Sequence, residues 1–188
     1  MDLILLQPGN PDVFGGANSW DNGGSLIDDE WRGDLKIGQC LELVSIHQGM
    51  KQQVTTDVSN SARTSGRPVI TEFTCVKYVD KTSVKFFDYC LRAEPLGAGK
   101  DQPTILYILR NSGDKTGNIL TISLRDALIT EIQFQSNPND MPTEQFKLNF
   151  TEILWTYTVQ KADAKSAGNL QSGWSIARNR PLGGAAFT

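Results

Sequence analysis

The sequence lacks the marks of several common functional classes. Its single histidine, His47, closes off metal sites built from several histidines, and no G-x-S-x-G nucleophile motif is present. Its three cysteines include no C-x-x-C pair, so we expect them to be small buried residues instead of metal ligands or a disulfide framework. No stretch approaches the roughly 18 apolar residues of a membrane-spanning helix, so we expect no membrane insertion.

An excess of basic charge is also missing. The 18 lysines and arginines are outnumbered by 21 aspartates and glutamates, which gives a net charge of −3. Nucleic-acid binders usually carry a basic patch, so no nucleic-acid partner is expected. The apolar run near the N-terminus is too short for a signal peptide and follows the acidic Asp2. We therefore expect assembly in the cytoplasm and, if the protein leaves the cell, export without a cleaved signal.

The composition is otherwise that of an ordinary folded domain. The chain has 188 residues, of which 39% are hydrophobic, and a chain of this size buries roughly 70% of its unfolded surface. We expect one domain over residues 1–180, with a long loop at about 8–34 and a flexible tail at 181–188. The loop is rich in Gly, Asn and Asp, a composition typical of irregular structure. Loops this long are uncommon and often functional.

Residues 72–93 carry the clearest secondary-structure pattern in the sequence. The first part of this stretch is predicted to be a strand. Its residues alternate with the period of two that a sheet imposes. One row holds Thr74, Val76 and Tyr78, and the other holds Phe73 and Cys75. Lys77 interrupts this second row, so we expect that face to be only partly buried.

The same stretch continues into one amphipathic helix. Thr82 or Ser83 can cap the first turn, because their hydroxyls accept from the free N–H groups of a helix start. Val84, Phe87 and Leu91 recur at helical spacing, so we expect the helix to dock through them. An adjacent stripe holds Phe86 and Cys90, and Pro95 and Gly97 follow the helix.

Most of the remaining chain alternates like strands. Extended segments are predicted at 3–6, 35–54, 104–110, 119–124, 128–134, 145–150, 153–159 and 173–179. The apolar phase slips at Thr151 and Glu152, which predicts a bulge or bend. Residues 57–68 are predicted to be a polar loop and 161–172 a mobile segment. The whole pattern predicts a mainly β fold: an antiparallel β-barrel, made of two packed sheets, with one flanking α-helix.

Four runs together resemble the haemolysin-coregulated protein (Hcp) family of bacterial type VI secretion. The first, FTCVKYVDKTSVKFFDYCLRA, is similar to the family's F-x-x-x-K-Y-x-D-K-x-[ST] segment. The second, MPTEQFKLNFTEILWTYTVQKADAK, is similar to its P-T-E-x-x-x-L-N-F segment. ISLRDALITEIQF and GWSIARN resemble two further family segments, and the four runs cover about residues 68–179 in the family's order.

The resemblance implies a structural tube protein and no enzyme, with no cofactor. Its subunits would form a homo-hexameric ring, and the rings would stack into a secreted tube. The implied partners are a VgrG-type spike protein, a contractile sheath and effector proteins carried in the lumen. By the same resemblance, Ser45, His47 and Gly49 would face the lumen and its cargo. Arg63 and Arg67 would contact a neighbouring subunit or ring.

Two other functions remain open from the residues alone. One is a metal-dependent hydrolase that uses the carboxylates of the long loop, although their spacing does not match a calcium-binding loop. These carboxylates are Asp12, Asp21, Asp28, Asp29 and Glu30. The other is a monomeric ligand-binding β-sandwich that uses exposed tryptophans. For His47, a half-buried histidine within the barrel is the alternative to a lumen position. The state of assembly separates these functions, because only the tube protein requires a six-subunit particle.

Overall fold

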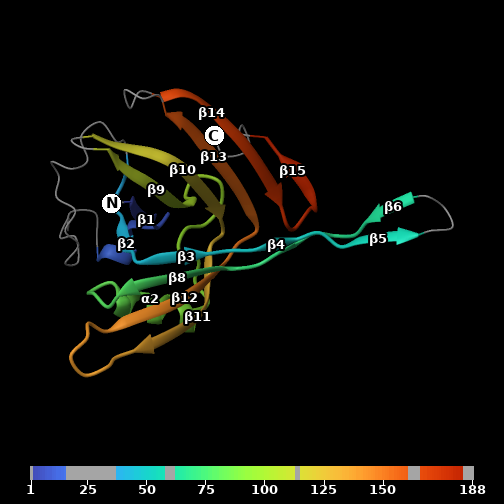
Figure 1. Ribbon diagram of the computed structural model, residues 1–188. Helices are drawn as coiled ribbons and strands as arrows, with labels where there is room; N and C mark the ends of the chain where they lie inside the picture. The colour runs from blue at the N-terminus through green and yellow to red at the C-terminus, as the bar shows by residue number, and fades with distance from the viewer. Residues whose placement is uncertain (1, 16–36, 58–61, 113–114, 161–165, 184–188) are drawn as a thin grey trace.

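The computed structural model describes residues 2–15, 37–57, 62–112, 115–160 and 166–183. Figure 1 shows two β-sheets packed on one another, with one α-helix at the side of the smaller sheet and a long two-stranded arm. The predicted mainly β fold with packed antiparallel sheets and one flanking helix is therefore confirmed.

The larger sheet has seven strands in the order β15-β14-β13-β10-β9-β1-β2, and all of its neighbours pair antiparallel. Its strands are β1 (Asp2–Gln7), β2 (Leu41–Leu43), β9 (Thr104–Ser112), β10 (Lys115–Arg125), β13 (Glu152–Gln160), β14 (Ser166–Ser175) and β15 (Arg180–Leu182). β14 includes part of the segment predicted to be mobile, and β15 includes the first two residues of the predicted tail. At these positions the chain is paired in the sheet instead, with β14 bonded to β13 and β15 bonded to β14.

The smaller sheet has four strands in the order β11-β12-β8-β3. They are β3 (Ser45–His47), β8 (Phe73–Tyr78), β11 (Leu128–Gln135) and β12 (Thr143–Asn149). The chain passes from one sheet to the other at three corners, at Val44, at 126–127 and at 150–151. The irregularity predicted at Thr151 is the third corner, where its N–H donates to the Arg125 carbonyl at 3.0 Å.

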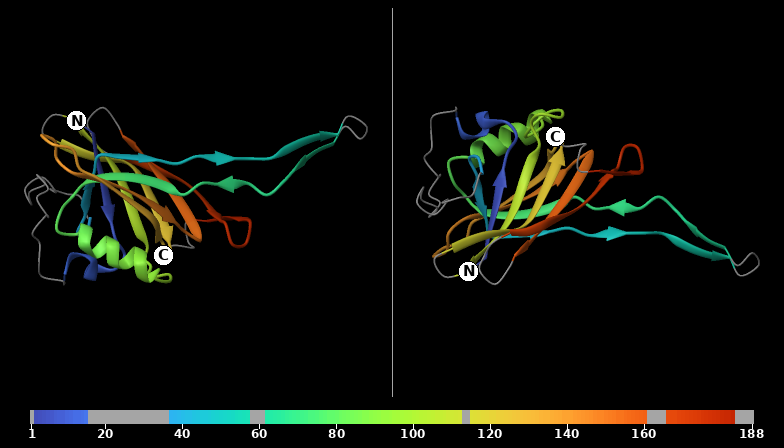
Figure 2. Two further views of the ribbon diagram at one scale, coloured as in Figure 1. Left: turned by 90° about the horizontal axis from the view of Figure 1, so that it is seen from below. Right: turned by 90° about the horizontal axis from the view of Figure 1, so that it is seen from above.

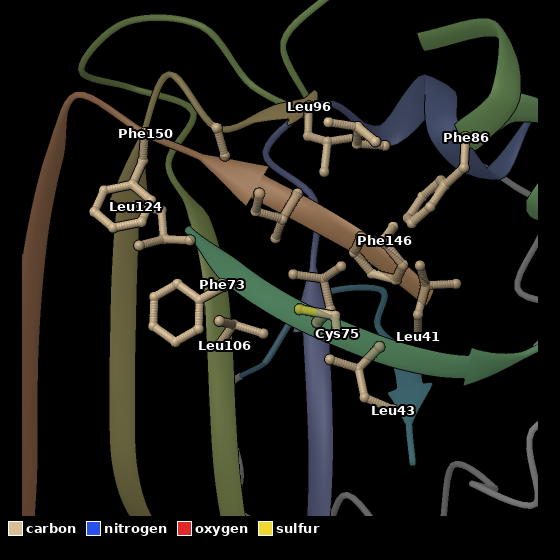
Figure 3. Close-up of a cluster of buried hydrophobic side chains, with 14 of the residues drawn as sticks. Leu41, Leu43, Phe73, Cys75, Phe86, Leu96, Leu106, Leu124, Phe146 and Phe150 are labelled. Atoms are coloured by element: carbon tan, nitrogen blue, oxygen red, sulfur yellow. The ribbon is translucent and has the colours of Figure 1, made fainter. Parts of the chain in front are cut away.

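The core lies between the two sheets (Figure 3). The predicted alternation in β12 is confirmed, because Phe146, Leu148 and Phe150 are all buried. The ring of Phe150 lies 5.8 Å from that of Phe73 on β8, measured between centroids. Leu106, on the larger sheet, is buried in the same cluster. Two of the cysteines, Cys40 and Cys75, are buried as expected, and Cys90 is half-buried.

The helix α2 (Ser83–Arg92) docks through a different stripe from the one predicted. Val84 and Leu91 are 70% and 87% exposed, whereas Phe86 and Tyr89 are buried. Phe86 stacks edge-on against Phe146 with ring centroids 5.0 Å apart. The prediction for Val84 and Leu91 was wrong because two apolar stripes compete on this helix, and the contacts that hold Ser83 inward select the other one.

The start of α2 also differs from the prediction. The side chain of Thr82, the residue before the helix, makes no capping hydrogen bond. Instead, the carboxylate of Asp80 accepts from the Thr82 N–H at 2.8 Å, and the Ser83 hydroxyl accepts from the Asp80 N–H at 3.0 Å. The short 3-10 helix η1 (Pro11–Phe14) packs beside α2, and the amide of Asn10 donates to the hydroxyl of Tyr89 at 3.1 Å.

The arm comprises residues 50–57 and 62–70 and projects away from the two sheets (Figure 2). It consists of β4 (Met50–Lys51), β5 (Val54–Asp57), β6 (Ala62–Ser65) and β7 (Val69–Ile70). β4 pairs with β7 and β5 pairs with β6. The predicted polar loop at 57–68 was therefore wrong in part, because β6 and the last residue of β5 lie in this range. Antiparallel pairing satisfies backbone groups that the Ser, Thr and Asn composition had suggested were solvated.

The described part of the chain contains no helix with the length and apolarity needed to cross a bilayer. Of the predicted loop at 8–34, the described residues include η1 at 11–14. Of the four tryptophans, Trp155 and Trp174 are half-buried against the core, and Trp20 and Trp31 lie outside the described residues.

Candidate functional surfaces

The first polar site is a buried charge cluster around Lys77. Its ammonium lies 2.7 Å from the Glu144 carboxylate and 3.0 Å from the Asp80 carboxylate. The side chains of Lys77 and Glu144 are both 0% exposed. The sequence predicted that this face of the strand would be partly exposed, and the structure shows it buried. A charge can be buried only where it is paired and hydrogen-bonded, and Glu144 meets that requirement from the neighbouring strand.

The cluster joins three elements. The hydroxyl of Ser83, at the start of α2, donates to Glu144 on β12 and accepts from Lys77 on β8, each at 3.0 Å. Lys77, Asp80 and Ser83 are motif positions of the first family-like run, and Glu144 is one of the second. The two motifs therefore meet in space and fix how the helix sits on the smaller sheet.

The second polar site is the outer face of the four-stranded sheet. Register places its residues in rows across β3, β8, β12 and β11. The first row is His47, Thr74, Lys147 and Glu131, and the second is Ser45, Val76, Gln145 and Gln133. We call these eight residues the polar sheet face. The polar alternation in β12 was visible in the sequence, but the pairing that builds the rows was not.

One ion pair lies within the polar sheet face. The Lys147 ammonium is 2.5 Å from the Glu131 carboxylate, and both side chains are about one third exposed. The hydrogen bond from Lys147 lowers the pKa of Glu131 below its usual value. The same bond raises the pKa of Lys147. Since the two charges compensate one another, the face carries little net charge.

The three predicted lumen residues lie in two different places. Ser45 and His47 are exposed on the polar sheet face, which excludes the alternative of a half-buried histidine inside the folded chain. Gly49 lies at the base of the arm, where its N–H donates to the Thr71 hydroxyl at 2.8 Å. The row of Leu41 and Leu43 does not continue into Ser45, because the chain changes sheets at Val44.

The two predicted contact arginines lie on the arm or at its base. Arg63 is on β6, opposite Thr56. The guanidinium of Arg67 donates to the backbone carbonyl of Ile176, just after β14. Arg67 therefore ties the arm to the larger sheet within the same chain.

No group of three or more potential metal ligands occurs in the part of the chain that the structure describes. Asp12 of the long loop is exposed on η1. Its predicted companions, Asp21, Asp28, Asp29 and Glu30, lie outside the described residues.

Two packed antiparallel sheets, one docked helix and an exposed polar sheet face define a two-layer, β-rich protein. The family described as "Type VI secretion system effector, Hcp" matches residues 35–157. The chain therefore belongs to the Hcp family, the tube proteins of type VI secretion.

Individual relatives agree with this membership. Protein hcp1 of Pseudomonas aeruginosa is 29% identical over 113 residues, which are 58% of this chain and 66% of that protein. A solved structure of a type six secretion system protein superposes with a TM-score of 0.75 at 17% identity, over 97% of this chain and all of the other. Hcp1 from Salmonella typhimurium gives a TM-score of 0.63 at 18% identity, over 96% and 99%. At these identities the two structures show a shared fold.

Proposed function

We propose that this chain is the subunit of six-membered rings that stack into a secreted tube, with the polar sheet face lining the lumen. The observation that carries the proposal is the two-sided character of the four-stranded sheet. Its inner row, which includes Phe73, Cys75 and Phe146, is buried in the core. Its outer rows hold hydroxyls, amides, the His47 imidazole, one compensated ion pair and a single apolar side chain, Val76. Such a surface suits a wall that faces water and passing protein without retaining either strongly.

Within this lumen, Ser45 and His47 contact cargo from β3, the edge strand of the smaller sheet. The cargo consists of effector proteins. His47 has Thr74 as its cross-strand neighbour, and Lys147 follows one strand further. The only other charged group in the two rows is Glu131. Cargo is therefore held mainly by hydrogen bonds to uncharged groups.

The same proposal assigns the remaining partners. A VgrG-type spike sits at one end of the tube, and a contractile sheath surrounds it. The subunits assemble in the cytoplasm. They leave the cell as the assembled tube, without a signal peptide. The arm contacts the neighbouring subunit or ring, with Arg63 and Arg67 near carboxylates of that neighbour. Family membership and the projection of the arm beyond both sheets support this assignment.

Electron microscopy of the purified full chain tests the proposal. We expect rings with a central hole, and a mass by mass photometry of six times the 20.7 kDa chain. A monomer stabilised by a divalent cation would overturn the proposal in favour of a metal-dependent hydrolase. A monomer indifferent to metal would favour a ligand-binding β-sandwich.

A further inference from the structure

A further charged side chain, that of Glu72, lies directly beside the polar sheet face. Glu72 immediately precedes β8, and because Phe73 is buried and side chains alternate, it projects to the same side as Thr74. Its carboxylate oxygen Oε1 accepts from the Asn149 amide and from the Thr130 hydroxyl, each at 3.0 Å. These donors lie on β12 and β11, which are side by side next to β8 (Figure 1). Two strands therefore hold a carboxylate in place at the start of a third.

The Thr130 hydroxyl reaches Glu72 because β11 is irregular at this point. Consecutive residues of β12 pair with Ile129 and Glu131, so Thr130 between them is an extra residue, a β-bulge. Strict alternation would place only one of Thr130 and Glu131 on the outer face, and the bulge allows both to lie there. The bulge therefore gives this face both the hydroxyl that holds Glu72 and the carboxylate that pairs with Lys147.

The charges on this part of the surface do not cancel. The Lys147 ammonium is already paired with Glu131. The hydrogen bond from Glu131 is the main cause that raises the pKa of Lys147, and the nearby charge of Glu72 adds to the rise. Among the described residues, Glu72 forms no ion pair of its own. Two carboxylates and one ammonium thus leave one negative charge in excess on each copy.

The excess charge lies at one end of the smaller sheet. Thr71, the residue before Glu72, accepts a hydrogen bond from a backbone N–H at the base of the arm, so this end is the one nearest the arm. Going away from the arm, the row of the ion pair follows about 7 Å further along the strand, and then comes the uncharged row of Ser45. In the proposed ring, the Glu72 carboxylates of six copies form a single band around the lumen. A channel with low-dielectric walls focuses the field of charges of one sign, so the band attracts cations.

We propose that Glu72 is a specificity-determining residue of the lumen, whose carboxylate selects effector proteins that present arginine or lysine side chains to the wall. The inference rests on the proposed tube function and adds the chemistry of the cargo. Asn149 and Thr130 hold the carboxylate in advance, so less conformational freedom is lost when a cation binds. A single exposed ion pair is weak, and repetition on six copies strengthens retention while each contact can still release. The polar sheet face supplies the uncharged hydrogen bonds, and Glu72 supplies the charge that discriminates among cargo proteins.

Peptide binding to purified rings tests the inference. The probe is a fluorescein-labelled peptide of four Arg-Gly repeats, and its neutral analogue carries citrulline in place of each arginine. Glu72→Gln keeps an oxygen that can accept from Asn149 and Thr130 but removes the charge. Fluorescence anisotropy at low salt, where screening is weakest, should show that this variant binds the arginine peptide at least fivefold more weakly and the citrulline peptide unchanged. The matched control, Glu94→Gln, removes the same charge at an exposed position after α2 and should leave both affinities unchanged.

Charge reversal gives an independent readout. Rings with Glu72→Lys should bind a peptide of four Glu-Gly repeats more tightly than the arginine peptide, which is the opposite of the wild-type preference. Circular dichroism and electron microscopy verify that the variants fold and form rings. Wild-type protein without rings would refute the proposed function. Rings that bind the arginine peptide equally well in wild type and Glu72→Gln, or that lose the same affinity in Glu94→Gln, would refute the role of Glu72 alone.

Discussion

Lys77 and Glu144 form an ion pair in which the ammonium and carboxylate lie 2.7 Å apart and neither side chain is exposed. Lys77 is on β8 and Glu144 on the adjacent strand β12, and Ser83 of α2 bonds to both. The pair therefore fixes the helix to the smaller sheet. Breaking a buried pair from one side leaves an unpaired charge in the core, which makes the pair a sensitive point of the fold.

Lys77→Met should destabilise the chain by about 3–5 kcal/mol, because Glu144 then stays buried without its cation. Lys77→Met combined with Glu144→Leu should recover most of that loss, since two apolar side chains need no partner. Urea titration of the three proteins measures the free energies of unfolding. A single substitution that shifts the free energy by less than about 1 kcal/mol would show that the pair does not hold the helix.

The helix should be sensitive along the stripe that the structure buries. Phe86→Ala should cost about 3–5 kcal/mol, because it opens a cavity against Phe146. Leu91→Ala should stay within about 0.5 kcal/mol in the monomeric chain, since that side chain touches solvent. Phe87→Ala should fall between them, because Phe87 is only half-buried. The reverse order, with Leu91 the most sensitive, would restore the docking stripe predicted from the sequence.

These results show which features of the fold a sequence can give. Period-two alternation located Phe146, Leu148 and Phe150 correctly, because a sheet between core and solvent leaves no other arrangement. The helical stripe was ambiguous, because Val84, Phe87 and Leu91 are as apolar as Phe86 and Tyr89. The hydrogen bond between Ser83 and Glu144, which are 61 residues apart in sequence, selects the stripe of Phe86 and Tyr89.

The candidate surfaces were harder to predict from the sequence for the same reason. For His47 the sequence left a lumen position and a half-buried position open. Only cross-strand register shows that Thr74, Lys147 and Glu131 lie in the same row as His47. The arm was missed because its Ser, Thr and Asn residues suit a loop as well as a paired strand. Lys77 was misjudged because a lysine is rarely buried, and nothing local reveals Glu144 as its partner.

The arm arginines give a prediction about salt. Arg63→Glu with Arg67→Glu changes the net charge of the arm from +2 to −2, so it should weaken ring stacking while the two sheets stay folded. Sedimentation at low and high salt measures the effect, which should be largest at low salt, where screening is weakest. Lys81→Glu with Lys85→Glu makes the same change of charge outside the arm and serves as the control. Stacking unaffected at low salt would remove the arginines from the contact.

The lumen assignment predicts a variant that separates assembly from transport. His47→Ala should leave the melting temperature and the rings unchanged, because the side chain is exposed on the polar sheet face. It should change the amount of effector that copurifies with each ring. Lys85→Ala, on the exposed face of α2, is the matched control and should retain the effector normally. Loss of rings in the His47 variant, with no separate effect on cargo, would show a structural role.

The buried thiol of Cys75 predicts how stability depends on alkaline pH. Burial raises the pKa of Cys75 from 9.0 to about 12. Between these values the unfolded thiol ionises and the folded one stays protonated, so the unfolded state is favoured as pH rises. Stability should therefore fall by up to roughly 1.4 kcal/mol per pH unit above pH 9. Burial also raises the pKa of Tyr107 from 10.0 to about 12, so a second loss begins near pH 10.

Cys75→Ala isolates the first of these two losses. The substitution lowers stability at every pH because it leaves a small cavity, but it should abolish the slope between about pH 9 and 10. The slope above pH 10 should remain, because Tyr107 is still buried and its hydroxyl still donates to Gln7 at 3.0 Å. Cys90→Ala should keep both slopes, since Cys75 is intact. Urea titrations at half-unit steps from pH 8 to 11 measure these slopes, and an unchanged slope between pH 9 and 10 in Cys75→Ala would assign the alkaline loss to other groups.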